Sequence, residues 1–253
     1  MSILQNKIAV ITGGNSGIGF ATAKELLLKG AKVVITGRRQ SAIDEAVKQL
    51  GPNATGILAD TADLSHTDAL VEKVKKLYGK VDILFINAGV GSFFPLDVAT
   101  EAQFDQIMNI NFKGAYFTLS KFLPLLKEGS SVILLSSVSA TTGMANSSVY
   151  GPSKAALNSL VKVAATELAP RKIRVNSVSP GPIETPILGK AGLDDATRAG
   201  FVTAFTARVP LKRFGTAREV DKLVALLGSD DATFITGGDY VVDGGVAINP
   251  IFG

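Results

Sequence analysis

The sequence predicts an α/β fold in which helices cover both faces of a doubly wound parallel sheet. Short runs rich in β-branched residues alternate along the chain with longer segments of helical period, the pattern of repeated strand–helix units. These short runs are apolar almost without interruption, as strands buried on both faces are. No linker rich in proline or serine and no internal repeat divides the chain, so we expect a single domain over residues 1–253.

The apolar runs have the length of strands rather than of helices. Strands are therefore expected at Lys7–Thr12, Ala31–Thr36, Ala54–Ala59, Val81–Ile86, Ser131–Ser136, Ile173–Val178 and Tyr240–Val242.

Segments with apolar residues at helical spacing separate these runs. Thr100 with Gln103, and Thr216 with Glu219, have the spacing of a capping box, which marks the start of a helix. The stretch 186–213 lacks a clear period and contains several glycines, so it is expected to be irregular and to act as a mobile substrate flap. Helices are expected at Gly17–Lys29, Ser41–Leu50, Ser65–Tyr78, Thr100–Lys127, Val149–Leu168 and Ala217–Leu227.

Composition excludes several classes of function. The chain has no cysteine and a single histidine, His66, so thiolate catalysis, Cys-ligated zinc, iron–sulfur clusters and His-rich metal sites are excluded, and no metal is expected. The net charge of +4 comes from scattered basic residues, so nucleic acid is not an expected partner. No apolar run approaches the roughly 18 residues of a membrane helix. The N-terminus also lacks a secretory-signal pattern, so we expect no membrane partner and a cytoplasmic location.

A glycine-rich loop, Thr12–Gly19, follows the first expected strand and leads into a helix. Glycines at this place permit a tight turn and let backbone amides approach a pyrophosphate at the helix N-terminus. The loop is not a P-loop, because no lysine followed by serine or threonine comes after the last glycine. The candidate cofactor-binding residues of this loop are Gly13, Asn15, Ser16, Gly17, Ile18 and Gly19.

The end of the second expected strand indicates which dinucleotide binds. An acidic residue there would accept hydrogen bonds from the ribose hydroxyls of NAD. This chain has Gly37 followed by Arg38 and Arg39, whose guanidinium groups pair well with a phosphate. The arginines favour NADPH/NADP+ over NAD, although solvated arginines leading into a helix would give the same pattern.

Tyr150 and Lys154 stand four residues apart at the start of an expected helix, and therefore on one helix face. A nearby ammonium favours the phenolate and so lowers the pKa of a tyrosine, which creates a general acid–base without histidine. Ser136 and Ser137 end the fifth expected strand, where a hydroxyl can reach a carbonyl oxygen held by the tyrosine. We take Tyr150, Lys154 and Ser137 as candidate catalytic residues.

Taken together, these motifs resemble the classical short-chain dehydrogenase/reductase family along nearly the whole chain, which implies a Rossmann-like sheet. Ser137 precedes Tyr150 by thirteen residues, a spacing common in this family, and the family's helix asparagine matches Asn111. The family's acidic residue near the adenine, its Asn-Ala-Gly and its Pro-Gly are also matched. The resemblance thereby adds cofactor-binding residues to the list: Asp60, Thr61, Asn87, Ala88, Gly89, Tyr150, Lys154, Pro180, Gly181, Ile183 and Thr185.

The resemblance also implies a mechanism. Tyr150 gives a proton to a substrate carbonyl oxygen that Ser137 polarises, while the nicotinamide delivers hydride to the carbonyl carbon. Lys154 lowers the pKa of Tyr150 and holds the nicotinamide ribose. Asn111 holds a water that relays protons, or alternatively satisfies backbone groups as an ordinary helix residue.

Three functions remain open at this stage. The expected one is NADPH-dependent interconversion of ketones and secondary alcohols, with a hydrophobic carbonyl substrate because Phe93, Phe94 and the flap supply apolar side chains. The alternatives are a 3-oxoacyl carrier-protein reductase of lipid synthesis and a non-catalytic NADP-binding sensor or scaffold. A serine hydrolase is excluded because His66 lies away from the serines and no G-x-S-x-G is present. The resemblance further implies a homotetramer, with a dimer as the alternative, and it identifies residues 1–253 as a single dinucleotide-binding and catalytic domain.

Overall fold

The computed structural model describes residues 3–184 and 195–248, and its centre is a sheet of seven parallel strands in the order β3-β2-β1-β4-β5-β6-β9. The order runs outward from β1 in one direction and from β4 in the other, so the switch point lies between these two strands. This is the Rossmann-like, doubly wound architecture that the sequence predicts. The strands are β1 (Ile8–Ile11), β2 (Lys32–Gly37), β3 (Ala54–Leu58), β4 (Val81–Ile86), β5 (Leu126–Leu135), β6 (Arg174–Pro180) and β9 (Asp239–Val242).

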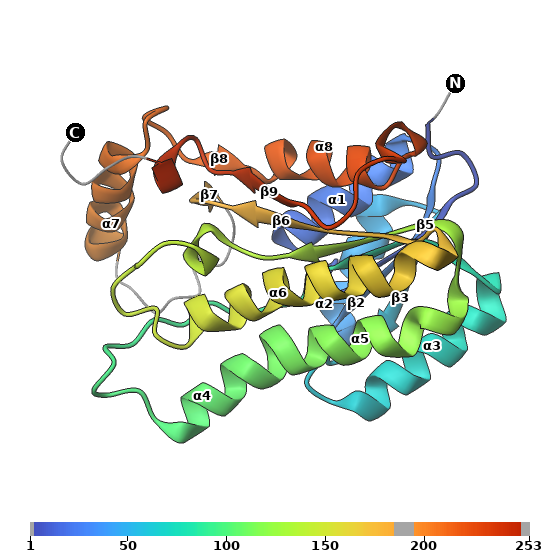
Figure 1. The fold of residues 1–253 in the computed structure, drawn as a ribbon, viewed down its shortest axis with the longest axis horizontal. Helices are drawn as coiled ribbons and strands as arrows, with labels where there is room; N and C mark the ends of the chain where they lie inside the picture. The colour runs from blue at the N-terminus through green and yellow to red at the C-terminus, as the bar shows by residue number, and fades with distance from the viewer. Residues whose placement is uncertain (1–2, 185–194, 249–253) are drawn as a thin grey trace.

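Helices cover both faces of the sheet, and Figure 1 shows α5 and α6 on one side with α1 and α8 on the other. The capping boxes expected at Thr100 and Thr216 are present, so α4 and α8 begin where the sequence predicts. The helices are α1 (Gly17–Leu28), α2 (Gln40–Leu50), α3 (Leu64–Tyr78), α4 (Glu101–Met108), α5 (Gly114–Phe122), α6 (Tyr150–Leu168), α7 (Asp195–Arg208) and α8 (Ala217–Leu227).

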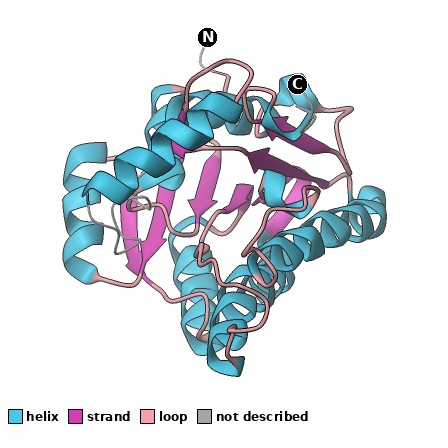
Figure 2. Cartoon of the chain, turned by 90° about the vertical axis from the view of Figure 1, so that its left-hand side faces the viewer, coloured by secondary structure: helices cyan, strands magenta, loops and turns pink. Residues whose placement is uncertain are grey.

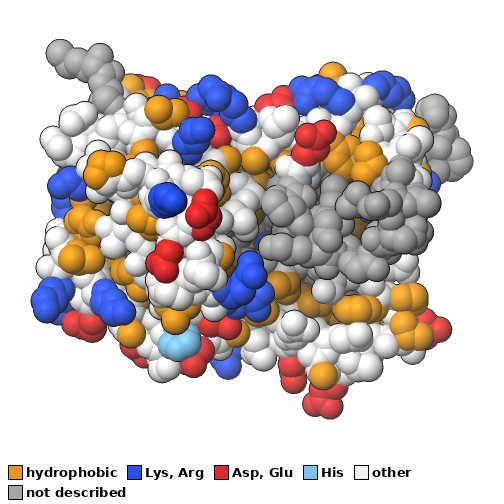
Figure 3. All heavy atoms as spheres, turned by 180° about the vertical axis from the view of Figure 1, so that it is seen from behind, with side chains coloured by type: hydrophobic (Ala, Val, Ile, Leu, Met, Phe, Trp, Pro, Cys, Tyr) orange, Lys and Arg blue, Asp and Glu red, His pale blue; other side chains and the backbone are white. Residues whose placement is uncertain are grey.

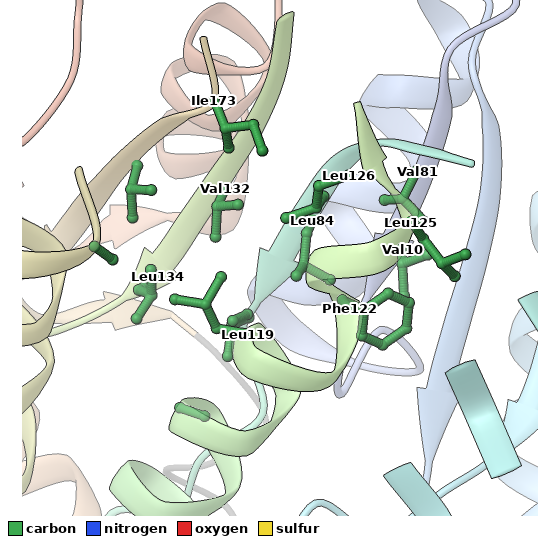
Figure 4. Close-up of a cluster of buried hydrophobic side chains, with 14 of the residues drawn as sticks. Val10, Val81, Leu84, Leu119, Phe122, Leu125, Leu126, Val132, Leu134 and Ile173 are labelled. Atoms are coloured by element: carbon green, nitrogen blue, oxygen red, sulfur yellow. The ribbon is translucent and has the colours of Figure 1, made fainter. Parts of the chain in front are cut away.

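Successive residues of each central strand are buried on opposite faces of the sheet. In β4, Leu84 and Ile86 belong to the cluster under α3, α5 and α6, whereas Ile83 and Phe85 belong to the cluster under α1, α2 and α8. Figure 4 shows the first cluster, in which Phe122 of α5 packs against side chains of the sheet. Burial on both faces explains the uninterrupted apolar runs in the sequence.

The segment predicted as one helix over Thr100–Lys127 is divided in the structure. A π-helix, Asn109–Lys113, joins α4 to α5, and the helical part ends in a short 3₁₀ turn at Leu123–Leu125. Strand β5 then starts at Leu126, earlier than predicted, because Leu126 pairs with Val81 before the register shifts. Within that shift, Ser130 donates a hydrogen bond from its hydroxyl to the carbonyl of Val81 at 2.9 Å, which ties the irregular part of the strand to β4.

Of the stretch predicted as irregular over 186–213, residues 186–194 lie outside the described residues. Residues 195–208 form the helix α7, so the prediction is wrong there. Gly200 in the middle of α7 breaks the pattern that would have indicated a helix. Close by, β7 (Ile183–Glu184) and β8 (Gly215–Thr216) form a two-stranded parallel ribbon that lies on either side of α7 in the sequence. The role of this stretch as a flap stays a prediction.

Two further features are the character of the helices and the distribution of charge on the surface. No helix within residues 3–184 and 195–248 is long and apolar enough to cross a membrane. On the face in Figure 3, lysine and arginine side chains are interspersed with aspartate and glutamate rather than gathered into a stripe, and the histidine lies at the surface.

Candidate active site

The candidate residues gather at the carboxyl edge of the sheet, which Figure 2 shows from the side where the strands end. Tyr150 begins α6, Ser137 lies just beyond the end of β5 after Ser136, and the glycine loop joins β1 to α1. Parallel strands bring these segments together because their carboxyl ends meet at one edge. The fold therefore places the expected catalytic and cofactor-binding segments side by side.

Tyr150, Lys154 and Ser137 form a compact group. The ammonium nitrogen Nζ of Lys154 lies 5.9 Å from the centroid of the Tyr150 ring and donates a hydrogen bond to the carbonyl of Leu135 at 2.8 Å. The hydroxyl of Ser137 is hydrogen-bonded with the Tyr150 side chain and also accepts from the backbone N–H of Ser139 at 3.2 Å. Lys154 is 4% exposed, so its charge is held inside the protein beside the phenol.

Burial dominates the electrostatics of this group. It raises the pKa of Tyr150, and the hydrogen bond with Ser137 opposes part of that rise. Burial also lowers the pKa of Lys154 to about 8. From the sequence, Lys154 is expected to lower the pKa of Tyr150. In the structure the ammonium lies over the ring and donates to Leu135, so burial decides that the pKa of Tyr150 is raised.

Gly151 allows the start of α6 to approach the turn that carries Ser137. A Cβ at this position would lie 2.9 Å from the carbonyl oxygen of Ser139 and 2.9 Å from the hydroxyl oxygen of Ser147. The backbone N–H of Gly151 also donates to the carbonyl of Ser147 at 2.8 Å. Sequence reasoning missed this residue, although a glycine directly after a helix-starting tyrosine is the signal that could have identified it.

Asn111 is buried in the π-helix, and its side chain is fully used by neighbouring groups. Its Oδ1 accepts from the N–H of Val90 at 2.8 Å, and its Nδ2 donates to the carbonyl of Val90 at 2.9 Å and to the hydroxyl of Ser153 at 3.1 Å. Ser153 in turn donates to the carbonyl of Tyr150 at 2.7 Å. Of the two alternatives for Asn111, the backbone-satisfying one is visible in these contacts, and the water relay stays a prediction.

Gly89 lies where Asn111 and Lys154 converge. A Cβ on Gly89 would be 3.2 Å from Oδ1 of Asn111 and 3.3 Å from Nζ of Lys154. The absence of a side chain lets the backbone at Gly89 lie close to the buried ammonium of Lys154 and to the Asn111 amide. Sequence reasoning missed Ser153 as a link in this group, although its position three residues after Tyr150 puts the two on one helix face.

The glycine loop is fixed by Asn87 and Thr12. The side-chain Nδ2 of Asn87 donates to the carbonyls of Thr12 at 2.9 Å and Gly13 at 3.1 Å, and Thr12 accepts from the N–H groups of Asn87 and Ala88 at 3.0 Å each. Gly19 must lack a side chain, because its Cβ would lie 2.5 Å from the carbonyl oxygen of Gly13. These contacts join the ends of β1 and β4 across the switch point. Thr12 carries a function that the sequence analysis did not assign.

The N-terminus of α1 is left without a side-chain cap. Ser16 stands at the capping position but makes no capping hydrogen bond, and the first turn holds no acidic residue. Gly13 and Gly17, with φ of +65° and +55°, turn the backbone into this helix. By contrast, Asp63 caps α3 with its side chain. Free N–H groups at a helix N-terminus, together with the helix dipole, are suited to an anionic phosphate.

The other predicted cofactor residues lie around this loop. Arg38 and Arg39 are exposed at the end of β2, and their side chains form no ion pair or hydrogen bond with any residue that the structure describes. A Cβ on Gly37 would lie 2.7 Å from Oδ1 of Asn15, so Asn15 covers the end of β2. The Asp60 carboxylate accepts from the N–H of Ala62 at 3.0 Å.

The remaining predicted positions are at the ends of β3 and β6. Thr61 is buried, and its carbonyl oxygen would lie 2.5 Å from a Cβ on Gly114, so α5 passes closely under it. Pro180 ends β6, Gly181 packs against Asp243, and Ile183 is buried in β7. Ile18 is half-buried in the first turn of α1. Thr185 lies outside the described residues.

These residues fit a phosphate-bearing dinucleotide. An uncapped helix N-terminus and exposed arginine side chains without partners among the described residues supply donors for phosphate. Lys154, close to Gly89, uses one of its three donors on Leu135. Among the residues that the structure describes, no group of three or more His, Asp or Glu side chains could hold a metal ion. The single histidine, His66, is exposed in the first turn of α3 and accepts from the N–H of Asp60 at 3.3 Å.

Comparisons with known proteins agree on one family. A family model described as enoyl-(acyl carrier protein) reductase matches residues 13–247. The chain is 42% identical over 250 residues to the oxidoreductase asL5 of Sarocladium schorii, covering 96% of this chain and 97% of that protein. It is 36% identical over 247 residues to the short-chain dehydrogenase/reductase SDRA of Arabidopsis thaliana, covering 96% and 95%. The crystal structure of levodione reductase matches with a TM-score of 0.92 at 31% identity, covering 98% of this chain and 100% of that one.

Proposed function

The chain belongs to the short-chain dehydrogenase/reductase family of oxidoreductases, which bind a nicotinamide cofactor, and on that premise we propose that it interconverts ketones and secondary alcohols with NADPH/NADP+. The observation that carries the proposal is the group at the carboxyl edge of the sheet. There a buried Lys154 lies over the ring of Tyr150, and Ser137 is hydrogen-bonded with the Tyr150 side chain. This arrangement provides a proton donor and a second hydroxyl directed at one point.

Tyr150 is the general acid in the direction of reduction. Burial raises the pKa of Tyr150, so the phenol carries its proton at neutral pH, which is the state needed to protonate a carbonyl oxygen. Ser137 donates a second hydrogen bond to that oxygen and stabilises the negative charge that develops on it. The bound nicotinamide cofactor supplies the hydride. Oxidation of the alcohol needs the phenolate instead, so it is favoured at alkaline pH.

Lys154 and Asn111 support this step. Nζ of Lys154 uses one of its three donors on Leu135, which leaves donors for the ribose of the nicotinamide. Asn111 keeps the backbone at Val90 in place and is linked to α6 through Ser153, so it positions the loop after β4 against the start of α6. We propose the proton relay at Asn111 on the family resemblance.

Preference for the phosphorylated cofactor rests on Arg38 and Arg39. Both are exposed at the end of β2, where neither has an acidic partner among the described residues. A guanidinium without a partner is available to pair with the 2′-phosphate of NADPH. No carboxylate occupies the position after Gly37, where NAD would be favoured.

The substrate we propose is a carbonyl compound with hydrophobic substituents. The phenol of Tyr150 lies beside the exposed ring of Phe93. One solved relative is named levodione reductase, a name that indicates a dione substrate for that protein. The stretch 186–213, with α7 inside it, is proposed as the flap over this substrate.

A second candidate is reduction of an acyl group on a carrier protein, which the description of the matching family model favours. Such a partner is acidic and needs basic side chains near the site. Arg213 is engaged instead with Glu219, through contacts of 2.6 and 2.9 Å, and Lys212 donates to the carbonyl of Ala207 at 2.7 Å. Because both basic side chains are already paired, we favour the ketone over the acyl group on a carrier protein as the substrate. A non-catalytic sensor is disfavoured because Tyr150, Lys154 and Ser137 are all in place.

The proposed function is tested with Tyr150→Phe. We expect kcat for ketone reduction to fall about 10²–10⁴-fold, while the NADPH dissociation constant stays nearly unchanged, because only the proton donor is removed. Tyr116→Phe on α5, where the ring is 44% exposed, is the matched control. Retention of more than a tenth of kcat by Tyr150→Phe would contradict the assignment. A wild-type chain that binds NADPH but reduces no ketone would favour the sensor.

We also propose a homotetramer. Large apolar side chains are exposed along the helical layer of α4, α5 and α6, at Phe104, Tyr116 and Val163, and on the edge strand β9 at Val241. A homotetramer assembled through two different interfaces needs two separate apolar faces. Here one face is helical and the other lies at the sheet edge.

A further inference from the structure

We propose that Phe93 is a specificity-determining residue whose ring forms the apolar wall against which the substituent of the substrate ketone packs. The inference rests on the proposed function and specifies the substrate class, namely ketones with an aromatic substituent. A contact between the rings of Phe93 and Tyr150, which the sequence does not reveal, supports the proposal. The two rings lie edge to face, with centroids 5.3 Å apart and planes at 64°.

The backbone on both sides of Phe93 is anchored by hydrogen bonds. On one side, Val90 is clamped through both its N–H and its carbonyl by the side chain of Asn111. On the other side, the N–H of Phe94 donates to the carbonyl of Asn146 at 2.7 Å, and Phe94 forms an isolated β-bridge with Ser147. The loop from β4 to α4 is therefore anchored on the segment that leads into the catalytic helix.

Gly91 fits between these anchors and beside both rings. A Cβ on Gly91 would lie 3.7 Å from Cε2 of Phe93 and 4.0 Å from Cε2 of Tyr150, so Gly91 lies next to both aromatic side chains. The backbone on both sides of Phe93 is thus anchored, and its ring packs on Tyr150. A ring fixed in this way presents the same surface to each substrate without first losing conformational freedom.

The ring is nevertheless 49% exposed. A phenylalanine held by backbone anchors and packed on a catalytic tyrosine, yet half open to solvent, leaves one aromatic surface without a partner in the described chain. Leu96 and Val98 of the same loop are exposed as well, so this loop carries an apolar surface out from the site. An aromatic substituent beside the carbonyl that Tyr150 protonates would lie against this surface, because aromatic pairs prefer offset or edge-to-face contact at such separations.

The experiment compares two ketones that differ only in the group beside the carbonyl, acetophenone and 2-butanone, in NADPH-dependent reduction. We expect Phe93→Ala to lower kcat/KM for acetophenone at least tenfold and for 2-butanone less than threefold. The loss for acetophenone should appear mainly in KM, because the contact exists in both the ground state and the transition state. Phe93→Tyr, which keeps the aromatic face, should restore most of the acetophenone activity, whereas Phe93→Leu should not.

Controls separate this role from a structural one. Phe234→Ala removes a fully exposed ring outside the site and should leave both ratios unchanged. The NADPH dissociation constant, from quenching or enhancement of nicotinamide fluorescence, should be the same in every variant. If Phe93 only supports Tyr150, kcat falls equally for both ketones, and the inference is refuted. If Phe93→Leu is as active on acetophenone as Phe93→Tyr, the aromatic wall is refuted while the proposed function stands. If the wild type reduces neither ketone, both fail.

Discussion

Asp221 gives a prediction in which the stability of the protein depends on pH through one buried carboxyl group. The side chain lies between α8 and α1 and is 4% exposed. Neither its Oδ1 nor the hydroxyl of Thr22 has a hydrogen-bond partner among the residues that the structure describes. Burial, and next the carboxylate of Glu25, raise the pKa of Asp221 to about 6 against the opposing attraction of Lys222, Arg218 and Lys29. We expect Asp221→Asn to stabilise the folded state most at high pH.

The sign and size follow from linkage. The folded-state pKa of about 6 lies above the unfolded value of roughly 3.9, so the folded state binds the proton more tightly, and the free energy of unfolding falls as pH rises through 6. The penalty for Asp221 at pH 8 approaches about 3 kcal/mol, and between pH 5 and pH 8 it grows by roughly 1–2 kcal/mol. Asparagine keeps the shape and carries no charge, so this growth disappears in the variant.

The assay is thermal and urea unfolding of both proteins at pH 5 and pH 8. The difference in free energy of unfolding between Asp221→Asn and wild type should increase by roughly 1–2 kcal/mol from pH 5 to pH 8, or several °C in Tm. Any constant cost of burying the amide cancels in this comparison. Asp97→Asn, at an exposed carboxylate, should show no such increase. A difference that is the same at both pH values would refute the reasoning.

Three further predictions follow from the structure. Replacing Arg38 and Arg39 together by alanine should raise KM for NADPH at least tenfold with little effect on KM for NADH, because the phosphate contact is lost; equal effects on both cofactors, in steady-state assays, would contradict the assignment. Gly151→Ala should lower kcat more than it lowers Tm, because the added methyl pushes α6 away from the turn carrying Ser137, and an unchanged kcat would show that the spacing is not critical. Light scattering should give the mass of four chains at micromolar concentration, and a monomer would rule out the tetramer.

Local patterns predicted most of the fold. The apolar runs of β1, β2 and β4 and the capping boxes of α4 and α8 depend on neighbouring residues alone, and the structure has them where the sequence predicts. The π-helix at Asn109–Lys113 could not be predicted, because its irregularity is coupled to the bonds that Asn111 makes with Val90, which is distant in the sequence. The early start of β5 depends in the same way on pairing with β4.

The candidate site likewise has features that local sequence predicted and features that depend on distant contacts. Spacing on one helix indicated that Tyr150 and Lys154 lie together, and the position of Ser137 at a strand end placed it nearby. The partner of the Asn111 side chain and the contact of Phe93 with Tyr150 depend on how the loop after β4 is anchored. Such loop geometry leaves no period in the sequence, so it can be found only in three dimensions.

The uncapped start of α1 has a thermodynamic consequence. Its first N–H groups lack the side-chain oxygen that caps α3 and α4, so a dinucleotide bound at this loop, as we propose, would complete the helix as well as occupy the site. A ligand present at a hundred times its dissociation constant adds about 2.7 kcal/mol to the free energy of unfolding. The amount of intact protein would then follow the supply of its own dinucleotide, and a melting curve in the presence of each nucleotide would rank their affinities without any substrate.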